Sequence, residues 1–213
     1  MKYTTVPVTD YEQNCSIIWC PKTKKAALID PGGDADKILS VVKNKKLVLD
    51  KILLTHGHLD HVSAAKDISS HYDIPIIGPH EADFYWLDLL PIETKMFGFP
   101  HAEAFLPHRW LVDGEKILLG KLTLNVIHCP GHTPGHVVFY EPKTKTAFVG
   151  DVLFKDSIGR TDFPGGNYND LINSIMNKLL PLGDDVVFIP GHGEKSTFGR
   201  EKKFNAYLLE DVT

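Results

Sequence analysis

The chain reads His56-Gly57-His58-Leu59-Asp60-His61 directly after the apolar run Ile52-Leu53-Leu54. Three imidazoles and one carboxylate therefore follow a predicted buried strand. Neutral imidazole is a common ligand of zinc and iron, and a carboxylate adds negative charge and binds hard cations. On a tight loop, alternate side chains can converge on one point while the next pair turns toward another. The segment predicts a metal site, and its four donors favour two adjacent ions.

Three later segments show the same pattern, in which a strand-like run is followed by a glycine and a candidate ligand. Residues 122–128 run into a loop rich in Pro and Gly that contains His132. Residues 147–149 run into Gly150-Asp151, and residues 186–189 run into Pro190-Gly191-His192-Gly193. A glycine beside the ligand lets the backbone approach a site closely. We expect these strand ends to point at one place.

The order and spacing of these motifs resemble the metallo-β-lactamase superfamily over most of the chain. Within it, the likeness is greatest to type II glyoxalases of a short, single-domain bacterial form, which hydrolyse S-lactoylglutathione. The segment 157–166 and the opening Asn14-Cys15-Ser16 strengthen this likeness. The resemblance implies one metal held by His56, His58 and His132. It implies a second metal held by Asp60, His61 and His192, with Asp151 bridging the two.

The implied ligand set suggests a mechanism. Two divalent ions can share a water, lower its pKa toward about 7 and hold the resulting hydroxide against a substrate carbonyl. Asp151 would fix the separation of the metals, and Asp60 would both ligate and orient the nucleophile. A thioester suits this design because its thiolate leaves without strong protonation. We expect two zinc ions, with iron and manganese as alternatives, since mixed nitrogen and oxygen ligands select poorly among them.

Substrate recognition is less well defined by the sequence. Gly159-Arg160 resembles a Gly-Lys pair that contacts the glutathione carboxylate in type II glyoxalases, and Arg160 could do so as a bidentate partner. A structural salt bridge is the alternative for Arg160. A tyrosine of the family pattern corresponds to Asp162 here, which puts affinity for glutathione in doubt. The long glyoxalases also have a C-terminal helical substrate domain, which we do not expect in a chain that ends at Thr213.

Composition is that of an ordinary enzyme. With 213 residues and 43% hydrophobic content, the chain can form one domain, residues 1–213, with a substantial core. The formal charge of −4 argues against a nucleic-acid partner. No signal peptide and no apolar run of about 18 residues is visible, so we expect no membrane association and a cytoplasmic location. Three cysteines at no zinc-ribbon spacing indicate reduced thiols, and Cys129 reads as a buried thiol and not a nucleophile.

Hydrophobic periodicity predicts strands clustered in runs between amphipathic helices. This favours a four-layer αββα sandwich of two similar halves, with the metal site at the sheet edge, as the resemblance implies. Periodicity alone leaves a simpler α+β arrangement open. We expect strands at residues 4–8, 16–20, 25–29, 51–55, 75–78, 116–118, 122–128, 137–140, 146–149 and 185–189. We expect helices at residues 34–42, with Asp34 as the cap, and at 62–71, 81–90, 168–180 and 200–209.

Several alternatives remain at this point. A persulfide dioxygenase uses a similar scaffold with a single iron, and other small esters or thioesters suit the same chemistry. A true β-lactamase, an RNA-processing nuclease and a metal-storage module are less favoured. His128 and His136 flank His132 and either orient a ligand or pack locally. Residues 91–107 read as a long irregular connection and a possible lid, and both a monomer and a homodimer are open.

Overall fold

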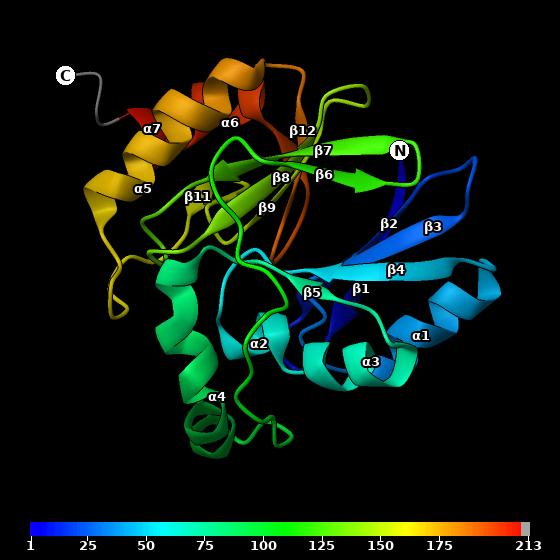
Figure 1. Ribbon diagram of the computed structural model, residues 1–213. Coiled ribbons are helices and arrows are strands. Elements are labelled where there is room, and N and C mark those ends of the chain that lie inside the picture. The colour runs from blue at the N-terminus through cyan, green and yellow to red at the C-terminus, as the bar shows by residue number, and fades with distance from the viewer. Residues whose placement is uncertain (210–213) are drawn as a thin grey trace.

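Two facing β-sheets with helices on both outer sides form a four-layer αββα sandwich, as expected (Figure 1). The computed structural model describes residues 1–209. Helices α1 to α4 lie on the outer side of the first sheet, and α5 to α7 lie on the outer side of the second (Figure 1). No helix among the described residues is long and apolar enough to cross a membrane.

The first half of the chain builds a sheet with strand order β1-β2-β3-β4-β5. Strands β1 to β3 are antiparallel, and β3, β4 and β5 are parallel. The strands are β1 (Lys2–Val8), β2 (Gln13–Trp19), β3 (Lys25–Ile29), β4 (Val48–Leu53) and β5 (Ile76–Ile77). The helices are α1 (Ala35–Asn44), α2 (Leu59–Val62), α3 (Ala65–Tyr72) and α4 (Phe84–Phe97), the last preceded by a 3-10 turn (Glu81–Asp83).

The second half builds a sheet with strand order β13-β12-β9-β8-β7-β6, in which only the β12–β9 pair is parallel. The strands are β6 (Lys116–Leu119), β7 (Leu122–His128), β8 (Val137–Glu141), β9 (Thr146–Gly150), β12 (Val187–Pro190) and β13 (Ser196–Thr197). A small hairpin joins β10 (Leu153–Phe154) to β11 (Ser157–Ile158). The helices are α5 (Tyr168–Ser174), continued by a π-helical turn (Ile175–Leu179) and a 3-10 turn (Leu180–Leu182), then α6 (Phe198–Phe204) and α7 (Ala206–Leu209).

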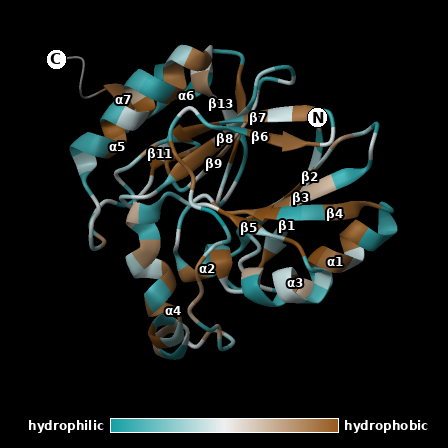
Figure 2. Cartoon of the chain, viewed as in Figure 1, coloured by the Kyte–Doolittle hydropathy of each residue, from teal (hydrophilic) through white to brown (hydrophobic). Residues whose placement is uncertain are grey.

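Three hydrophobic layers hold this sandwich together, one between the sheets and one under each set of helices. The period of two along a strand sends neighbouring side chains to different layers. Ile52 in β4 packs under the helices, for example, while Leu53 packs between the sheets. Figure 2 shows the apolar residues concentrated in the strands and on the inner helix faces. Each layer contains one cysteine, which is Cys15, Cys20 or Cys129, and all three thiols are free and buried.

The structure corrects the prediction for residues 91–107, because α4 continues through Pro91 to Phe97 and only the remainder is irregular. A proline inside a helix loses one hydrogen bond and costs about 3 kcal/mol. The buried side chains Leu87 and Leu90 offset this cost, since full burial of each contributes about 1.5–3 kcal/mol. Beyond the proline, Thr94 is buried and its hydroxyl donates to the Leu90 carbonyl at 2.8 Å, which connects the last turns to the rest of the helix.

Other helix predictions were also wrong in detail. Asp34 makes no side-chain cap at α1, because its φ of 45° turns the carboxylate away, and Oδ2 instead accepts a hydrogen bond from the Thr9 N–H at 3.0 Å. The helix expected over residues 62–71 is two helices, α2 and α3. They separate at Ala64, whose N–H donates to the Pro31 carbonyl at 3.0 Å and not to a carbonyl of the preceding helical turn.

Candidate metal centre

Four loops that follow β4, β7, β9 and β12 meet at one edge of the sandwich. Backbone hydrogen bonds tie them together, from Val137 N–H to the Thr55 carbonyl at 2.8 Å and from Gly191 N–H to the Gly150 carbonyl at 2.8 Å. Short bonds of this kind fix the loops relative to both sheets. The side chains that these loops carry therefore have little freedom to separate.

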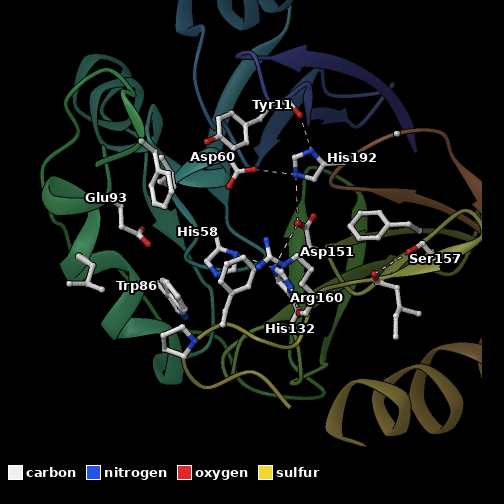
Figure 3. A pocket seen from close by; sticks show the side chains of 18 of the residues that line it. Tyr11, His58, Asp60, Trp86, Glu93, His132, Asp151, Ser157, Arg160 and His192 are labelled. Atoms are coloured by element: carbon white, nitrogen blue, oxygen red, sulfur yellow. Dashed lines mark hydrogen bonds and ion pairs between the residues drawn. The ribbon is translucent and has the colours of Figure 1, made fainter. Parts of the chain in front are cut away.

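The structure brings all the candidate ligands predicted from the sequence to this edge. Potential ligand atoms of His56, His58 and His132 lie within 4.8 Å of one another. The same holds for Asp60, His61 and His192. Figure 3 shows His58, Asp60, His132, Asp151 and His192 converging at the floor of one cavity.

The first group presents three imidazole nitrogens to one point. His58 Nδ1 lies 3.1 Å from His56 Nε2 and 3.0 Å from His132 Nε2. Burial, followed by the neighbouring imidazoles, lowers the pKa of His56 well below its usual value and that of His58 to about 3. Burial also lowers the pKa of His132. Neutral rings with converging lone pairs are the form that binds a metal.

The second group combines imidazole with carboxylate. Asp60 Oδ2 lies 3.1 Å from His192 Nε2 and 3.7 Å from His61 Nε2. Burial tends to raise the pKa of Asp60, but the adjacent His61 and His192 lower it overall. Burial tends to lower the pKa of His61, but Asp151 and Asp60 raise it well above its usual value. A positive charge beside these carboxylates is favourable, and a proton on His61 or a bound cation can supply it.

Asp151 lies between the two groups. Its Oδ1 is 3.4 Å from His61 Nε2, and its Oδ2 is 3.6 Å from His192 Nε2 and 3.8 Å from His132 Nε2. Burial tends to raise the pKa of Asp151, but the surrounding imidazoles, His61 first, lower it far below its usual value. The carboxylate is thus ionised and reaches toward both groups.

Orphaned polar atoms show that this centre fits a metal. Two atoms that face the centre, His61 Nε2 and Asp151 Oδ1, are buried and have no hydrogen-bond partner. Buried polar atoms without a partner are costly and rare in folded proteins. Nitrogen and carboxylate oxygen ligands in this mixture suit zinc, iron or manganese.

Asp30 orients the second group and was not identified from the sequence. Its Oδ1 accepts the Thr55 N–H at 2.7 Å, and its Oδ2 accepts the Thr55 hydroxyl at 2.6 Å and lies 3.0 Å from His61 Nδ1. Holding Nδ1 leaves Nε2 of His61 facing Asp60 and Asp151. The sequence signal was an acid directly after a strand, the same pattern that marks the ligands.

Asp83 joins two of the ligand loops and was also missed. It is fully buried, and its carboxylate accepts hydrogen bonds from Gly57 N–H at 2.9 Å, Gly135 N–H at 2.6 Å and the Thr133 hydroxyl at 2.8 Å. Gly57 separates two ligand histidines, and Thr133 follows His132. Burial, only partly opposed by these donors, raises the pKa of Asp83 to about 6. An acid at the start of a helix carries no sequence signal for such a role.

Of the two histidines that flank His132, one supports the ligands and the other packs locally. His136 Nε2 accepts the Asp151 N–H at 3.1 Å, and its ring stacks on His56 at 4.6 Å, so it supports the ligand shell. His128 Nε2 lies 2.9 Å from the Pro134 carbonyl, and the ring stacks on His80 away from the centre. None of His71, His80, His101 and His108 belongs to a candidate metal group among the described residues.

A cavity of about 1360 Å³ opens above the centre. It is lined on one side by α4 and on the other by the β10–β11 hairpin and the loop around Phe163. Arg160 lies on this second side, where its guanidinium makes a two-point ion pair with Asp162 at 2.9 and 2.7 Å and stands 4.4 Å from the Phe163 ring. Cys129 is buried elsewhere, and burial raises the pKa of its thiol, which does not suit a nucleophile.

Known proteins share both the sequence and the fold. The family model of the Metallo-beta-lactamase superfamily matches residues 8–192. The hydroxyacylglutathione hydrolase GloC of Haemophilus influenzae is 48% identical over 209 residues, which cover 98% of each chain. The crystal structure of BLEG-1 B3 metallo-beta-lactamase is similar with a TM-score of 0.90 and 35% identity, over 97% of this chain and 99% of that one. A di-iron-bound form of TTHA1623 is similar with a TM-score of 0.87 and 34% identity, over 96% and 100%.

Proposed function

The chain belongs to the metallo-β-lactamase superfamily as a metal-dependent hydrolase, and from that premise we propose that it hydrolyses S-lactoylglutathione to lactate and glutathione. The observation that carries this proposal is the double group of imidazoles and carboxylates, with its orphaned buried atoms, at the floor of a large cavity. The relative at 48% identity bears the name of this activity. The described residues would work as one hydrolase domain.

The ligand assignment is part of the proposal. His56, His58 and His132 would hold one divalent ion and Asp60, His61 and His192 a second, with Asp151 shared. Zinc is the proposed metal, with iron and manganese as alternatives. When bound, two such ions lower the pKa of a shared water and polarise a substrate carbonyl.

The chain's own residues orient the reaction. Asp60 contacts His192 and His61 through Oδ2, which leaves its second oxygen to accept a hydrogen bond from the attacking water. Asp151 holds the two groups of imidazoles at a fixed spacing through its two oxygens. The apolar side chains of α4 line the cavity above the centre, where they would contact a bound substrate. A thiolate leaves without strong protonation, so the reaction needs no separate general acid.

The test is S-lactoylglutathione hydrolysis by metal-replete protein, with metal content measured on the same sample. We expect rapid turnover with about two metals per chain. Asp60→Ala should reduce kcat at least about 100-fold, whereas Asp67→Ala, an exposed acid on the nearby α3, should match the wild type. Two bound metals with no turnover would overturn the substrate assignment and direct attention to other esters and thioesters.

A further inference from the structure

One face of α4 forms an apolar wall of the cavity. Tyr85, Leu89, Glu93 and Phe97 follow one another at four-residue spacing, which places them on the same side of the helix, and all four line the cavity. Met96 lines it too, with 71% of its surface exposed. Within residues 1–209, Glu93 is the one charged residue that α4 contributes to this lining.

The other charged groups of the lining, outside the metal centre, already have partners. Lys155 pairs with Glu194 at 2.5 Å, and Asp156 pairs with Arg200 at 2.7 Å. Arg160 pairs with Asp162 through the Nε and Nη2 groups of its guanidinium. The charged side chains opposite α4 are therefore neutralised by ion pairs within the protein.

Glu93 is the exception. Its Oε2 is buried and has no hydrogen-bond partner, and the described part of the chain offers it no ion pair. Figure 3 shows its side chain extending from α4 on the cavity side, across from Asp60 and His58. Burial, and then the negative charge of Asp60, raises the pKa of Glu93 to about 7. A carboxylate in this position gains most from a positively charged donor.

We propose that Glu93 determines substrate specificity by binding an ammonium group of the thioester substrate. This inference rests on the proposed function and deepens it, because a glutathione thioester carries one ammonium, on its γ-glutamyl end. That end would lie against α4 while the thioester carbonyl lies over the metal centre. The cavity volume of about 1360 Å³ is ample for a molecule of this size.

This orientation also gives the substrate a charged contact that Arg160 does not supply in its present pairing. A substrate carboxylate at Arg160 would have to displace Asp162, whereas an ammonium at Glu93 displaces no protein partner. Leu89 and Phe97 line the cavity beside Glu93, so a bound substrate would cover the ion pair from water and strengthen it. Recognition by α4 is thus selective for a cation on an otherwise apolar surface.

The experiment uses a matched pair of non-hydrolysable probes, S-methylglutathione and its N-acetyl derivative, which lacks the ammonium. Calorimetry on the metal-replete protein should show the wild type binding the free-amine probe at least about tenfold more tightly. Glu93→Gln should remove this preference without changing metal content. Asp88→Asn, the same change at an exposed acid of α4 outside the lining, should keep it.

The outcomes separate this inference from the proposed function. Equal binding of the two probes by the wild type, or an unchanged preference in both Glu93→Gln and Glu93→Leu, would overturn the role of Glu93 while S-lactoylglutathione turnover still upheld the activity. Absence of that turnover in the wild type would overturn the proposed function and this inference together. A preference lost in both Glu93 variants and kept in Asp88→Asn supports the inference.

Discussion

Asp83 connects the loop after β4 to the loop after β7 through two backbone N–H groups and one hydroxyl. Asp83→Ala removes this connection and leaves the donors buried without a partner, which costs about 1–3 kcal/mol for each. We expect metal affinity to fall at least about tenfold and the thermal midpoint to fall with it. Calorimetric titration of the apo protein with zinc measures the metal affinity.

Asp83→Asn provides the matched control, because it keeps the size of the side chain and one acceptor oxygen. It should recover part of the metal affinity, since one oxygen can still accept from Gly57 or Gly135 but the amide group cannot accept from the other. Equal zinc affinity in the wild type and Asp83→Ala would show that the two loops are held without Asp83.

Gly191 leaves room for two proposed ligands. A Cβ at this position would lie 2.0 Å from Asp151 Oδ1 and 2.6 Å from His61 Cε1. Gly191→Ala should therefore displace both side chains and lower metal content per chain, with kcat reduced at least about 100-fold. Elemental analysis and S-lactoylglutathione assays measure these effects. Gly193→Ala is the control, because it introduces strain at a φ of 73° but its Cβ meets no atom within 4 Å. If Gly193→Ala keeps its metal, the loss of metal in Gly191→Ala is due to the clash with Asp151 and His61.

At the residue scale, the sequence predicted the groups that meet at the centre but not the groups that hold them. The ligands could be found because they follow strands and most of them stand beside a glycine, and because His56, His58, Asp60 and His61 are nearly contiguous. Asp30 and Asp83 act through loops distant from them in the chain. Their partners are three backbone N–H groups, the hydroxyls of Thr55 and Thr133 and the ring of His61, and these contacts form only in the folded structure.

Helix α4 should control substrate affinity without affecting metal binding. Ile92 and Met96 line the cavity and are 58% and 71% exposed, so they contribute little to the core. The double variant Ile92→Ala/Met96→Ala should raise KM for S-lactoylglutathione by about three- to tenfold, since the two truncations together remove apolar contact worth about 1 kcal/mol. Steady-state kinetics with metal content on the same sample tests this. A fall in metal content with unchanged KM would contradict the assignment of α4 as a substrate wall.

Helix α6 is anchored by Glu201, which is fully buried and accepts hydrogen bonds from Asp156 N–H at 2.8 Å, Arg200 at 2.7 Å and Asn205 at 3.2 Å, as well as from Ser196. Glu201→Ala should lower the free energy of unfolding by about 3 kcal/mol, because it leaves several donors unpaired. Urea unfolding measures the change. The metal content of the folded protein should stay at the wild-type level. A loss of metal would show that Glu201 also helps to position the metal ligands.

At the element scale, the predictions failed where tertiary packing overrides a local signal. Pro91 is a strong local reason to end a helix, yet α4 continues because its buried face extends on both sides of the proline. Asp34 is a favourable cap by composition, yet its backbone adopts a left-handed conformation and its carboxylate binds Thr9. The long strands were easier to predict, because their periodicity extends over several residues, as in β2, β3 and β7.

Across the whole molecule, the proposed ligands come from loops of both sheets, so metal binding should stabilise the assembled sandwich. Ligand present at about 1,000 times its Kd stabilises a folded protein by about 4 kcal/mol. For a chain of this size, removal of the metal by a chelator should lower the thermal midpoint by on the order of 10 °C. Differential scanning calorimetry with and without chelator checks this. An identical midpoint in both conditions would show that the sheets assemble independently of the centre.

Two runs of strands with intervening helices favoured the four-layer fold, and the family resemblance implied it, whereas periodicity alone left a simpler α+β arrangement open. The relative placement of the halves did not follow from periodicity, because it depends on contacts such as the hydrogen bond from Val137 N–H to the Thr55 carbonyl, which joins residues 82 positions apart (137 − 55). Such contacts leave no periodic signal in the sequence.

The free thiols of Cys15, Cys20 and Cys129 lie one in each hydrophobic layer. Each of these side chains is at most 1% exposed, so alkylation of each thiol by a water-soluble reagent reports the opening of the structure around it. Peptide mapping after timed alkylation would rank the layers by their opening free energies without any introduced label. Simultaneous labelling of all three thiols would indicate one cooperative unit, and staggered labelling would identify the layer that opens first.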